Sequence, residues 1–305
     1  MTFPFEHFYK SFLRSCGQVM LQGNAITGLL FLLGIALNST TMLLGITLAI
    51  ISALAVAKLW QFDLTVVQDG LYGFNAALVG VAVFYFLPVS FFSTLMVIFG
   101  GAFSTVLMHF TLTRMARIPA FTTPFILSTW LILLFIEYTE LTIIVSHSLD
   151  EGYFGGNNTA TVIDYFQASM RGIGQVMLQG YWLSGLFFFC ALFIHARKVA
   201  AWALFGSFTS LLIATGLNFP QEKIIMGLYG FNSCLVAIAL SDRYPAKPWL
   251  ITLAVLVSVL LTRLFELLTL PALTAPFVIT TLLCIGLVNL KNFYDAKRSA
   301  KNLLF

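Results

Sequence analysis

The sequence predicts an all-α polytopic membrane protein: two inverted five-span repeats with discontinuous or half-spanning helices around a central pore. The 305-residue chain is 59% hydrophobic and only 9% charged, whereas soluble domains average about 25% charged residues. Its apolar stretches are long and continuous, which favours helical spans over a transmembrane barrel. The chain also contains an internal repeat. This composition argues against a soluble enzyme, a nucleic-acid-binding protein and a disordered chain.

The repeat consists of three short motifs that occur twice in the same order. The first and second motifs each keep eight of ten positions at an offset of 157 residues, and the third recurs at an offset of 152. The chain is therefore a duplicated unit of roughly 150 residues. The motifs are RSCGQVMLQG (14–23) and RGIGQVMLQG (171–180), GLYGFNAALV (70–79) and GLYGFNSCLV (227–236), and IPAFTTPF (118–125) and LPALTAPF (270–277).

Each repeat contains five apolar segments. Several are shorter than the about 20 residues that a straight span needs, so tilt, flanking residues or broken helices must complete them. An odd number of spans per unit turns the second unit upside down in the membrane, which predicts inverted repeats. The segments lie near 25–37, 42–59, 71–89, 91–110 and 124–145, and near 181–194, 199–218, 228–240, 249–265 and 275–290.

The basic residues predict the orientation. With the N-terminus in the cytoplasm, 13 of the 16 lysines and arginines fall on the cytoplasmic side, and Arg171, Lys223 and Arg263 fall outside. We therefore expect both termini in the cytoplasm, and the compact chain indicates a bacterial inner-membrane protein. The expected segments are an N-terminal cytoplasmic segment (1–13), the first repeat (14–145), an extracytoplasmic loop (146–165), the second repeat (166–290) and a basic cytoplasmic tail (291–305).

Few ionisable groups are expected at membrane depth. Glu137 and Glu140 lie three residues apart on one helix face, and Glu266 follows Arg263 by three residues, a spacing at which the two side chains can pair. Such groups serve either helix packing or ion-coupled transport. The cysteines and histidines lack metal-ligand spacing, and no catalytic motif is present. We expect no enzyme activity, no metal and no cofactor.

Neutral polar residues recur at matching positions of the two halves. Taken singly, such residues often join membrane helices by hydrogen bonds. Four symmetric pairs within repeated motifs favour a path lined by amide and hydroxyl groups near a pseudo-twofold axis. The pairs are Gln18 and Gln175, Gln22 and Gln179, Asn75 and Asn232, and Thr122 and Thr274.

The third motif contains two prolines in each half. Proline removes a backbone N–H and clashes with the preceding helical turn, so these positions predict broken helices with unpartnered carbonyls. Broken helices at corresponding points of two repeats point to a substrate site. Free carbonyls would suit a substrate rich in N–H groups, and Phe74 and Phe231 would offer it a flat wall. The prolines are Pro119 and Pro124, and Pro271 and Pro276.

Together these motifs resemble the urea transporter family, whose LPxxTxPF signature occurs once per half. The Gly-Gln-Val and Gly-Leu-Tyr-Gly-Phe-Asn elements of both halves are similar to that family as well, and the resemblance covers about residues 14–290. Ile118 stands where the signature has Leu, a conservative change.

The resemblance implies a homotrimer in membrane lipid, with a separate pore between the two halves of each protomer and urea as the permeant. It implies passive passage through a constricted filter, with Thr122 and Thr274 at the centre and Gln18 and Gln175 toward the mouths. The implied slot walls are Leu21 and Leu178, Phe74 and Phe231, and Leu78 and Leu235.

In the family, some slot positions near the glutamine are Phe, whereas Leu21 and Leu178 stand here. This difference predicts a wider slot, with consequences for selectivity among urea-like amides. Two alternatives within transport remain: a proton-coupled transporter, and a pathway for ammonium or another small amide. An ammonia pathway would be expected to place histidines in its pore, and no symmetric histidine pair occurs.

Overall fold

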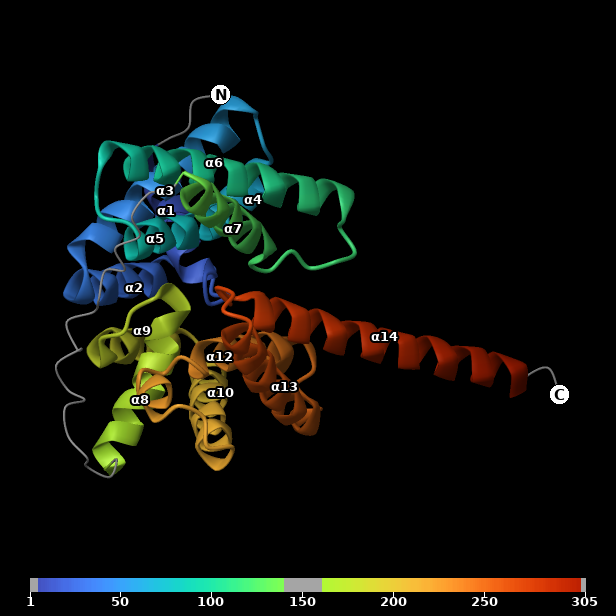
Figure 1. The fold of residues 1–305 in the computed structure, drawn as a ribbon. Helices are drawn as coiled ribbons and strands as arrows, with labels where there is room; N and C mark the ends of the chain where they lie inside the picture. Colours follow the sequence, from blue (N-terminus) through green and yellow to red (C-terminus); the bar gives the residue numbers. More distant parts are fainter. Residues whose placement is uncertain (1–4, 140–160, 303–305) are drawn as a thin grey trace.

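The structure, a computed structural model, describes residues 5–139 and 161–302. Every regular element within these residues is a helix. The helices of the first half lie together, and those of the second half form a neighbouring group below them in Figure 1. Glu140 and most of the predicted loop 146–165 lie outside the described residues.

The described part of each half contains the same series of seven α-helices. The first half comprises α1 (Phe5–Gln18), α2 (Ala25–Asn38), α3 (Thr40–Leu59), α4 (Leu64–Gln68), α5 (Phe74–Phe86), α6 (Phe91–Arg114) and α7 (Thr123–Tyr138). The second half comprises α8 (Val162–Gly174) with the 3-10 turn η2 (Gln175–Met177), α9 (Trp182–His195), α10 (Arg197–Gly216), α11 (Gln221–Ile225), α12 (Gly230–Arg243), α13 (Pro248–Leu267) and α14 (Ala275–Asn302).

All ten predicted apolar segments contain a helix. The sequence reading did not identify α1 and α8, because they are amphipathic rather than apolar throughout. It also did not resolve the short helices α4 and α11. Among the described residues, five helices are long and apolar enough to cross a membrane by themselves, and α8 with η2 and α9 forms a further candidate span that bends by 79°. The five are α3, α6, α10, α13 and α14, while α2, α5 and α7 are shorter apolar helices.

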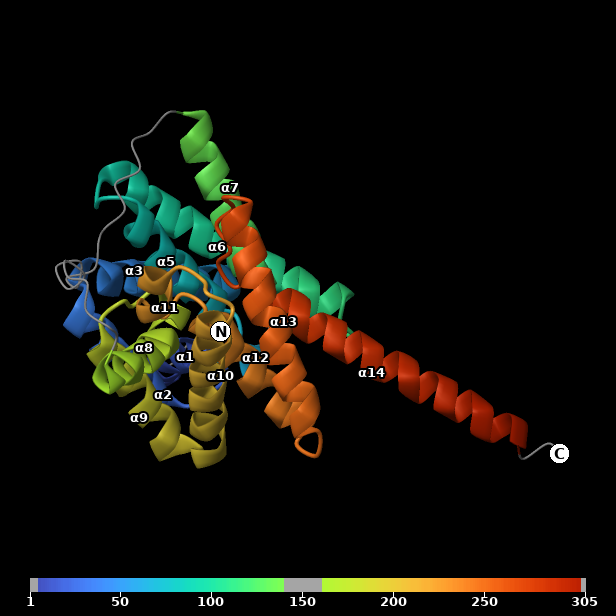
Figure 2. The same ribbon diagram turned by 60° about the horizontal axis from the view of Figure 1, so that its bottom comes forward.

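The helices of the two halves pack in the same pattern. In both, the third helix of the series contacts the fifth and the sixth, and the first contacts the second. Between the halves, α2 packs against α9 and α7 contacts α14, so that each of these helices meets its own counterpart. Figures 1 and 2 show α14 leaving this junction and extending away from the other helices.

The contact between α2 and α9 combines aromatic packing with polar bonds. The rings of Phe31 and Phe188 lie 4.7 Å apart. The Ser184 hydroxyl donates a 2.7 Å hydrogen bond to the carbonyl oxygen of Gly34. Hydroxyl-to-backbone bonds of this kind hold helices together where water is absent.

Glycines allow α3 and α5 to approach backbone to backbone. A Cβ at Gly45 would lie 2.3 Å from the carbonyl oxygen of Gly80.

We expect Gly45→Ala to lower the free energy of unfolding by about 1–3 kcal/mol, because the two helices must separate. Thermal unfolding of the purified protein measures the change. Gly286→Ala is the control, since nothing lies within 4 Å of a Cβ there, and equal stability of the two variants would contradict this packing.

Candidate functional site

Two predicted site residues meet at the junction of the two halves. The Oγ1 atoms of Thr122 and Thr274 lie 2.7 Å apart, at hydrogen-bond distance, and both residues are buried. Thr122 directly precedes α7, and Thr274 directly precedes α14. The contact therefore joins the N-terminal ends of two equivalent helices.

The second proline of the third motif marks a helix start in each half. Pro124 is the second residue of α7, and Pro276 is the second residue of α14. The missing N–H of proline costs little in the first turn of a helix, where the donor has no intrahelical partner. The helical structure is thus interrupted before α7 and before α14, in the residues that precede Thr122 and Thr274.

An asparagine of the second motif spans each break. Asn75 Nδ2 donates to the carbonyl oxygen of Phe121 at 3.3 Å, and its Oδ1 accepts from the backbone N–H of Phe125 at 3.0 Å. Asn232 makes the same two bonds in the other half, 3.2 and 3.1 Å long. Both asparagines are fully buried. Their amides therefore bind the backbone. From the sequence alone, this role could not be distinguished from lining a transport path.

The expectation of unpartnered carbonyls is wrong at three positions near the breaks. The carbonyl oxygens of Phe121 and Leu273 accept from the two asparagines. That of Pro271 accepts from Trp130 Nε1 at 2.9 Å. In each case a side chain from another helix supplies the donor that the broken helix lacks.

The predicted mouth residues Gln18 and Gln175 each close a short helix of their own half. Gln18 Nε2 donates to the carbonyl oxygen of Asp69, the C-cap residue that follows α4, at 2.9 Å. Gln175 Nε2 donates to the carbonyl oxygen of Met226, the C-cap residue that follows α11, at 3.2 Å. Arg14 and Arg171 donate to the preceding carbonyls, those of Gln68 and Ile225. The first motif thus supplies donors to helix carbonyls that have no partner within the helix.

The predicted slot residues Leu21 and Leu178 occupy matching turns. Both have a left-handed backbone, with φ of 61° and 57°. Gln22 and Gln179 stabilise these turns by donating to carbonyls within them. Each turn follows the end of the first helix of its half and leads into the second.

The other four predicted slot residues lie on the fifth helix of each half. Phe74 and Leu78 are one turn apart on α5, and Phe231 and Leu235 are one turn apart on α12. All four are buried. No hydrogen bond joins Gln18 or Gln175 to the threonine pair within the part of the chain that the structure describes.

The tyrosine of the second motif has a different partner in each half. The Tyr72 hydroxyl lies 3.0 Å from Nδ1 of His109, whose ring stacks on Phe62 at 3.8 Å. In the other half, the Tyr229 hydroxyl donates to Glu266 Oε2 at 2.6 Å. His109 and Glu266 occupy equivalent positions, 157 residues apart. The sequence reading missed this correspondence, although the offset of the second motif already encodes it.

Glu266 is held by two cationic side chains. Arg263 pairs with it as the three-residue spacing predicted, and Lys223 Nζ of α11 lies 2.7 Å from the same oxygen. Glu137, by contrast, is exposed at the end of α7, and its predicted neighbour on the helix face, Glu140, is outside the described residues.

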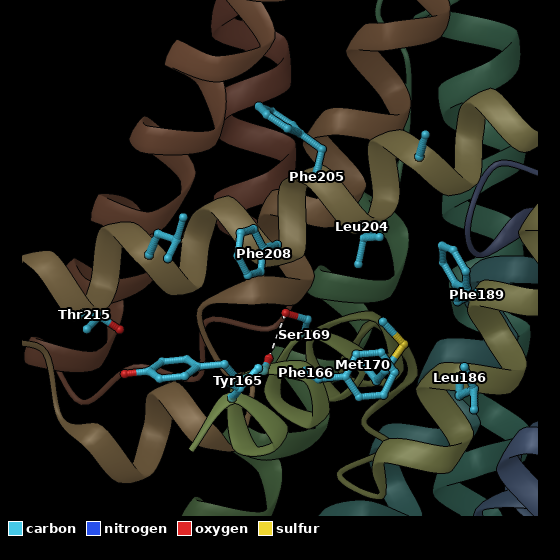
Figure 3. Close-up of a pocket in the computed structure, with 13 residues that line it drawn as sticks. Tyr165, Phe166, Ser169, Met170, Leu186, Phe189, Leu204, Phe205, Phe208 and Thr215 are labelled. Atoms are coloured by element: carbon cyan, nitrogen blue, oxygen red, sulfur yellow. Dashed lines mark hydrogen bonds between the residues drawn. The ribbon is translucent and has the colours of Figure 1, made fainter. Parts of the chain in front are cut away.

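An apolar cavity lies away from these residues. It has a volume of about 810 Å³ and is formed by α8, α9 and α10. Its lining is almost entirely apolar, and the hydroxyl of Ser169 is turned to the carbonyl oxygen of Tyr165 (Figure 3). None of the ten predicted site residues lines it. An apolar hollow of this kind suits contact with another apolar group rather than with a polar solute.

The fold and the paired polar residues define a helical membrane protein of two similar halves whose equivalent helix ends meet in the interior. A profile of the urea transporter family matches residues 9–289, nearly the whole chain. The chain belongs to this family, and it is a transporter rather than an enzyme.

Mammalian proteins named urea transporter 1 are similar over almost the same range. The mouse protein is 30% identical over 300 residues, which is 90% of this chain and 76% of the mouse protein. The rat protein is 28% identical, with the same two coverages. The sheep protein is 27% identical and covers 89% of this chain and 74% of its own length.

The cluster of Glu266 with Lys223 and Arg263 (the Glu266 cluster) leads to a prediction about stability. Glu266→Gln leaves Lys223 and Arg263 without their counter-charge, and we expect it to lower the free energy of unfolding by about 1–2 kcal/mol. Thermal unfolding at low salt measures this. Glu137→Gln serves as the matched control and is expected to leave stability unchanged, because Glu137 is exposed. Equal melting temperatures for both variants would contradict a stabilising role of the cluster.

Proposed function

We propose that this protein conducts urea passively across a membrane through a narrow filter between its two halves. The contact between Thr122 and Thr274 is the observation that carries the proposal. Phe121, next to Thr122 in the chain, packs edge to face against Phe277, three residues after Thr274, with ring centroids 5.2 Å apart. Hydroxyl groups next to aromatic rings would suit a small, flat, polar permeant. Family membership supports urea as that molecule.

Each proposed residue role follows from the hydrogen-bonding capacity of urea. Urea is neutral and planar, with four N–H donors and one carbonyl oxygen. The hydroxyl oxygens of Thr122 and Thr274 would accept its N–H groups at the centre. In Gln18 and Gln175 the amide nitrogen donates to a helix carbonyl, so the amide oxygen can accept from urea toward each mouth. The proposed slot walls are Leu21, Leu178, Phe74, Phe231, Leu78 and Leu235.

A row of weak acceptors favours conduction over tight binding. Each hydrogen bond to urea replaces one to water, and its net contribution is only about 0.5–1.5 kcal/mol. Several nearly equal sites therefore lower the barrier without trapping the solute. Apolar walls beside these acceptors would not replace the hydration of an ion, so cations would be excluded.

The proposed membrane arrangement is a pair of inverted repeats around this filter. The contacts of α2 with α9 and of α7 with α14 support a pseudo-twofold relation, because each joins equivalent elements. The distribution of lysine and arginine supports cytoplasmic termini, and we place the protein in a bacterial inner membrane. The proposal includes the homotrimer with one pore per protomer, and the segment boundaries at residues 13, 145, 165 and 290.

The described carboxylates offer little support for a proton-coupled mechanism. Glu266 is engaged by Lys223, Arg263 and Tyr229, and Glu137 is exposed at a helix end. A coupling carboxylate would need to exchange protons next to the permeant. Passive conduction requires no such group.

Valine at the two threonine positions tests the filter. Thr122→Val and Thr274→Val keep the shape of the side chain and remove its hydroxyl. We expect each to lower urea flux about three- to tenfold, the loss of one hydrogen bond of about 0.5–1.5 kcal/mol at the barrier. Stopped-flow light scattering of proteoliposomes measures the flux. Thr252→Val on α13 is the control, because its exposed hydroxyl donates only to its own helix, and unchanged flux in both filter variants would refute the assignment.

A pH gradient separates conduction from coupled transport. We expect urea flux into proteoliposomes to be the same with and without the gradient, because no carboxylate takes part in the proposed path. Glu266→Gln should likewise keep its urea flux in protein that remains folded. Flux that appears only with the gradient, and is lost in Glu266→Gln or Glu137→Gln, would replace the channel by a coupled transporter.

A further inference from the structure

We infer that Asn75 and Asn232 cap the N-termini of α7 and α14 in place of Thr122 and Thr274, and thereby free the two threonine hydroxyls to face each other. The inference rests on the proposed urea filter. It identifies the residues that position the filter without touching the permeant.

A threonine that precedes a helix normally caps it. The first N–H groups of a helix lack intrahelical partners, and the side-chain oxygen of a Ser or Thr N-cap accepts from the second or third of them. Thr122 precedes α7, yet its side chain makes no capping hydrogen bond. Its backbone, at φ −95° and ψ 16°, also differs from the extended conformation usual for an N-cap.

Asn75 supplies the missing cap from another helix. The second residue of α7, Pro124, has no N–H, so the donor that needs an acceptor is the N–H of Phe125, the third residue. It donates to Asn75 Oδ1 at 3.0 Å. Asn75 Nδ2 donates to the carbonyl oxygen of Phe121. One buried amide thus fixes the backbone on both sides of Thr122.

The second half repeats both asparagine bonds. Pro276 is again the second residue of the helix, and the N–H of Phe277 donates to Asn232 Oδ1 at 3.1 Å. The asparagine donates in turn to the carbonyl oxygen of Leu273. Leu273 and its counterpart Phe121 share a positive φ, of 44° and 43°. The same substitute cap therefore precedes both helices whose threonines meet.

The two possible bonds of a threonine hydroxyl compete. Capping would turn the Thr122 side chain toward the first turn of α7, whereas the observed contact turns it toward Thr274 in the other half. Because Asn75 satisfies Phe125, the hydroxyl is not drawn back to its own helix. The asparagines are therefore positioning residues, and their removal should act on transport through the threonines.

A double-mutant cycle tests this dependence. Urea flux is measured by stopped flow in proteoliposomes that contain wild-type protein, Asn75→Ala, Thr122→Val or the double variant. We expect Asn75→Ala to lower flux roughly tenfold in the wild-type background, and less than about twofold in the Thr122→Val background, where no hydroxyl is left to displace. The free energy of unfolding should fall in both backgrounds, since the cap is lost in each.

Asn24→Ala is the matched control. Asn24 caps α2 within its own chain segment, with Oδ1 accepting from the N–H groups of Ile26 and Thr27. Its loss removes a comparable cap, and it should change flux by the same factor whether residue 122 is Thr or Val. Equal flux factors for Asn75→Ala in the two backgrounds would overturn the inference, because the asparagine would then act through general stability or on urea directly.

Hydrogen–deuterium exchange makes the test independent of transport. Asn75→Ala should accelerate exchange at the Phe125 amide, and Asn24→Ala should not; equal exchange in wild type and Asn75→Ala would overturn the cap.

Absence of urea flux in folded wild-type protein would refute the proposed function, and the exchange result would still decide the cap. Should Asn75→Ala fail to fold, Asn232→Ala with Thr274→Val provides the same cycle in the other half.

Discussion

Broken helices inside a membrane protein carry backbone groups that must find partners without water. An unpaired backbone N–H or C=O group in hydrocarbon raises the free energy of the protein by several kcal/mol, on the order of the cost of burying any polar group without a partner. Here side-chain amides from neighbouring elements meet that requirement. Asn75 and Asn232, both fully buried, bind the breaks before α7 and α14. Gln18 and Gln175 bind the carbonyls that follow two short helices, and the bond of Gln18 lies at an exposed site. The halves hold their interrupted helices in place through these four amides.

This requirement accounts for the three segments that the two halves still share. The first motif donates to the carbonyls directly before the second motif, and the second motif binds the backbone of the third. In each half these hydrogen bonds form one set that joins the first motif to the two residues before the second motif, and the second motif to the third. Changing Gln18 or Asn75 removes the side-chain donor to a backbone carbonyl. The two sets meet where Thr122 contacts Thr274. Segments outside the sets, such as the one containing His109 and Glu266, have diverged.

The sequence predicted the elements whose signal is local. Apolar length located ten helices, the repeat paired them, and the spacing of Arg263 and Glu266 predicted their ion pair. The amphipathic α1 and α8 were missed because they lack continuous apolar stretches. The capping role of Asn75 could not be read from the sequence, because its partner Phe125 is 50 residues away and becomes a neighbour only when α5 packs against α7. The prolines correctly marked the breaks, but their effect depends on a position at the helix start that sequence boundaries do not fix.

The threonine contact also bears on how such a chain arises. A residue that touches its own counterpart needs only one unit's sequence to specify both sides of the contact. A single unit of half this length, paired with a second copy of itself, would already contain the complete pair of hydroxyls. After fusion of two units, most positions can change independently, as His109 and Glu266 have. Thr122 and Thr274 cannot, since a substitution in one alters the surroundings of the other. Gene fusion thus relaxes the identity of the two halves at many positions, and the contact of Thr122 with Thr274 resists this change because each residue is the other's partner.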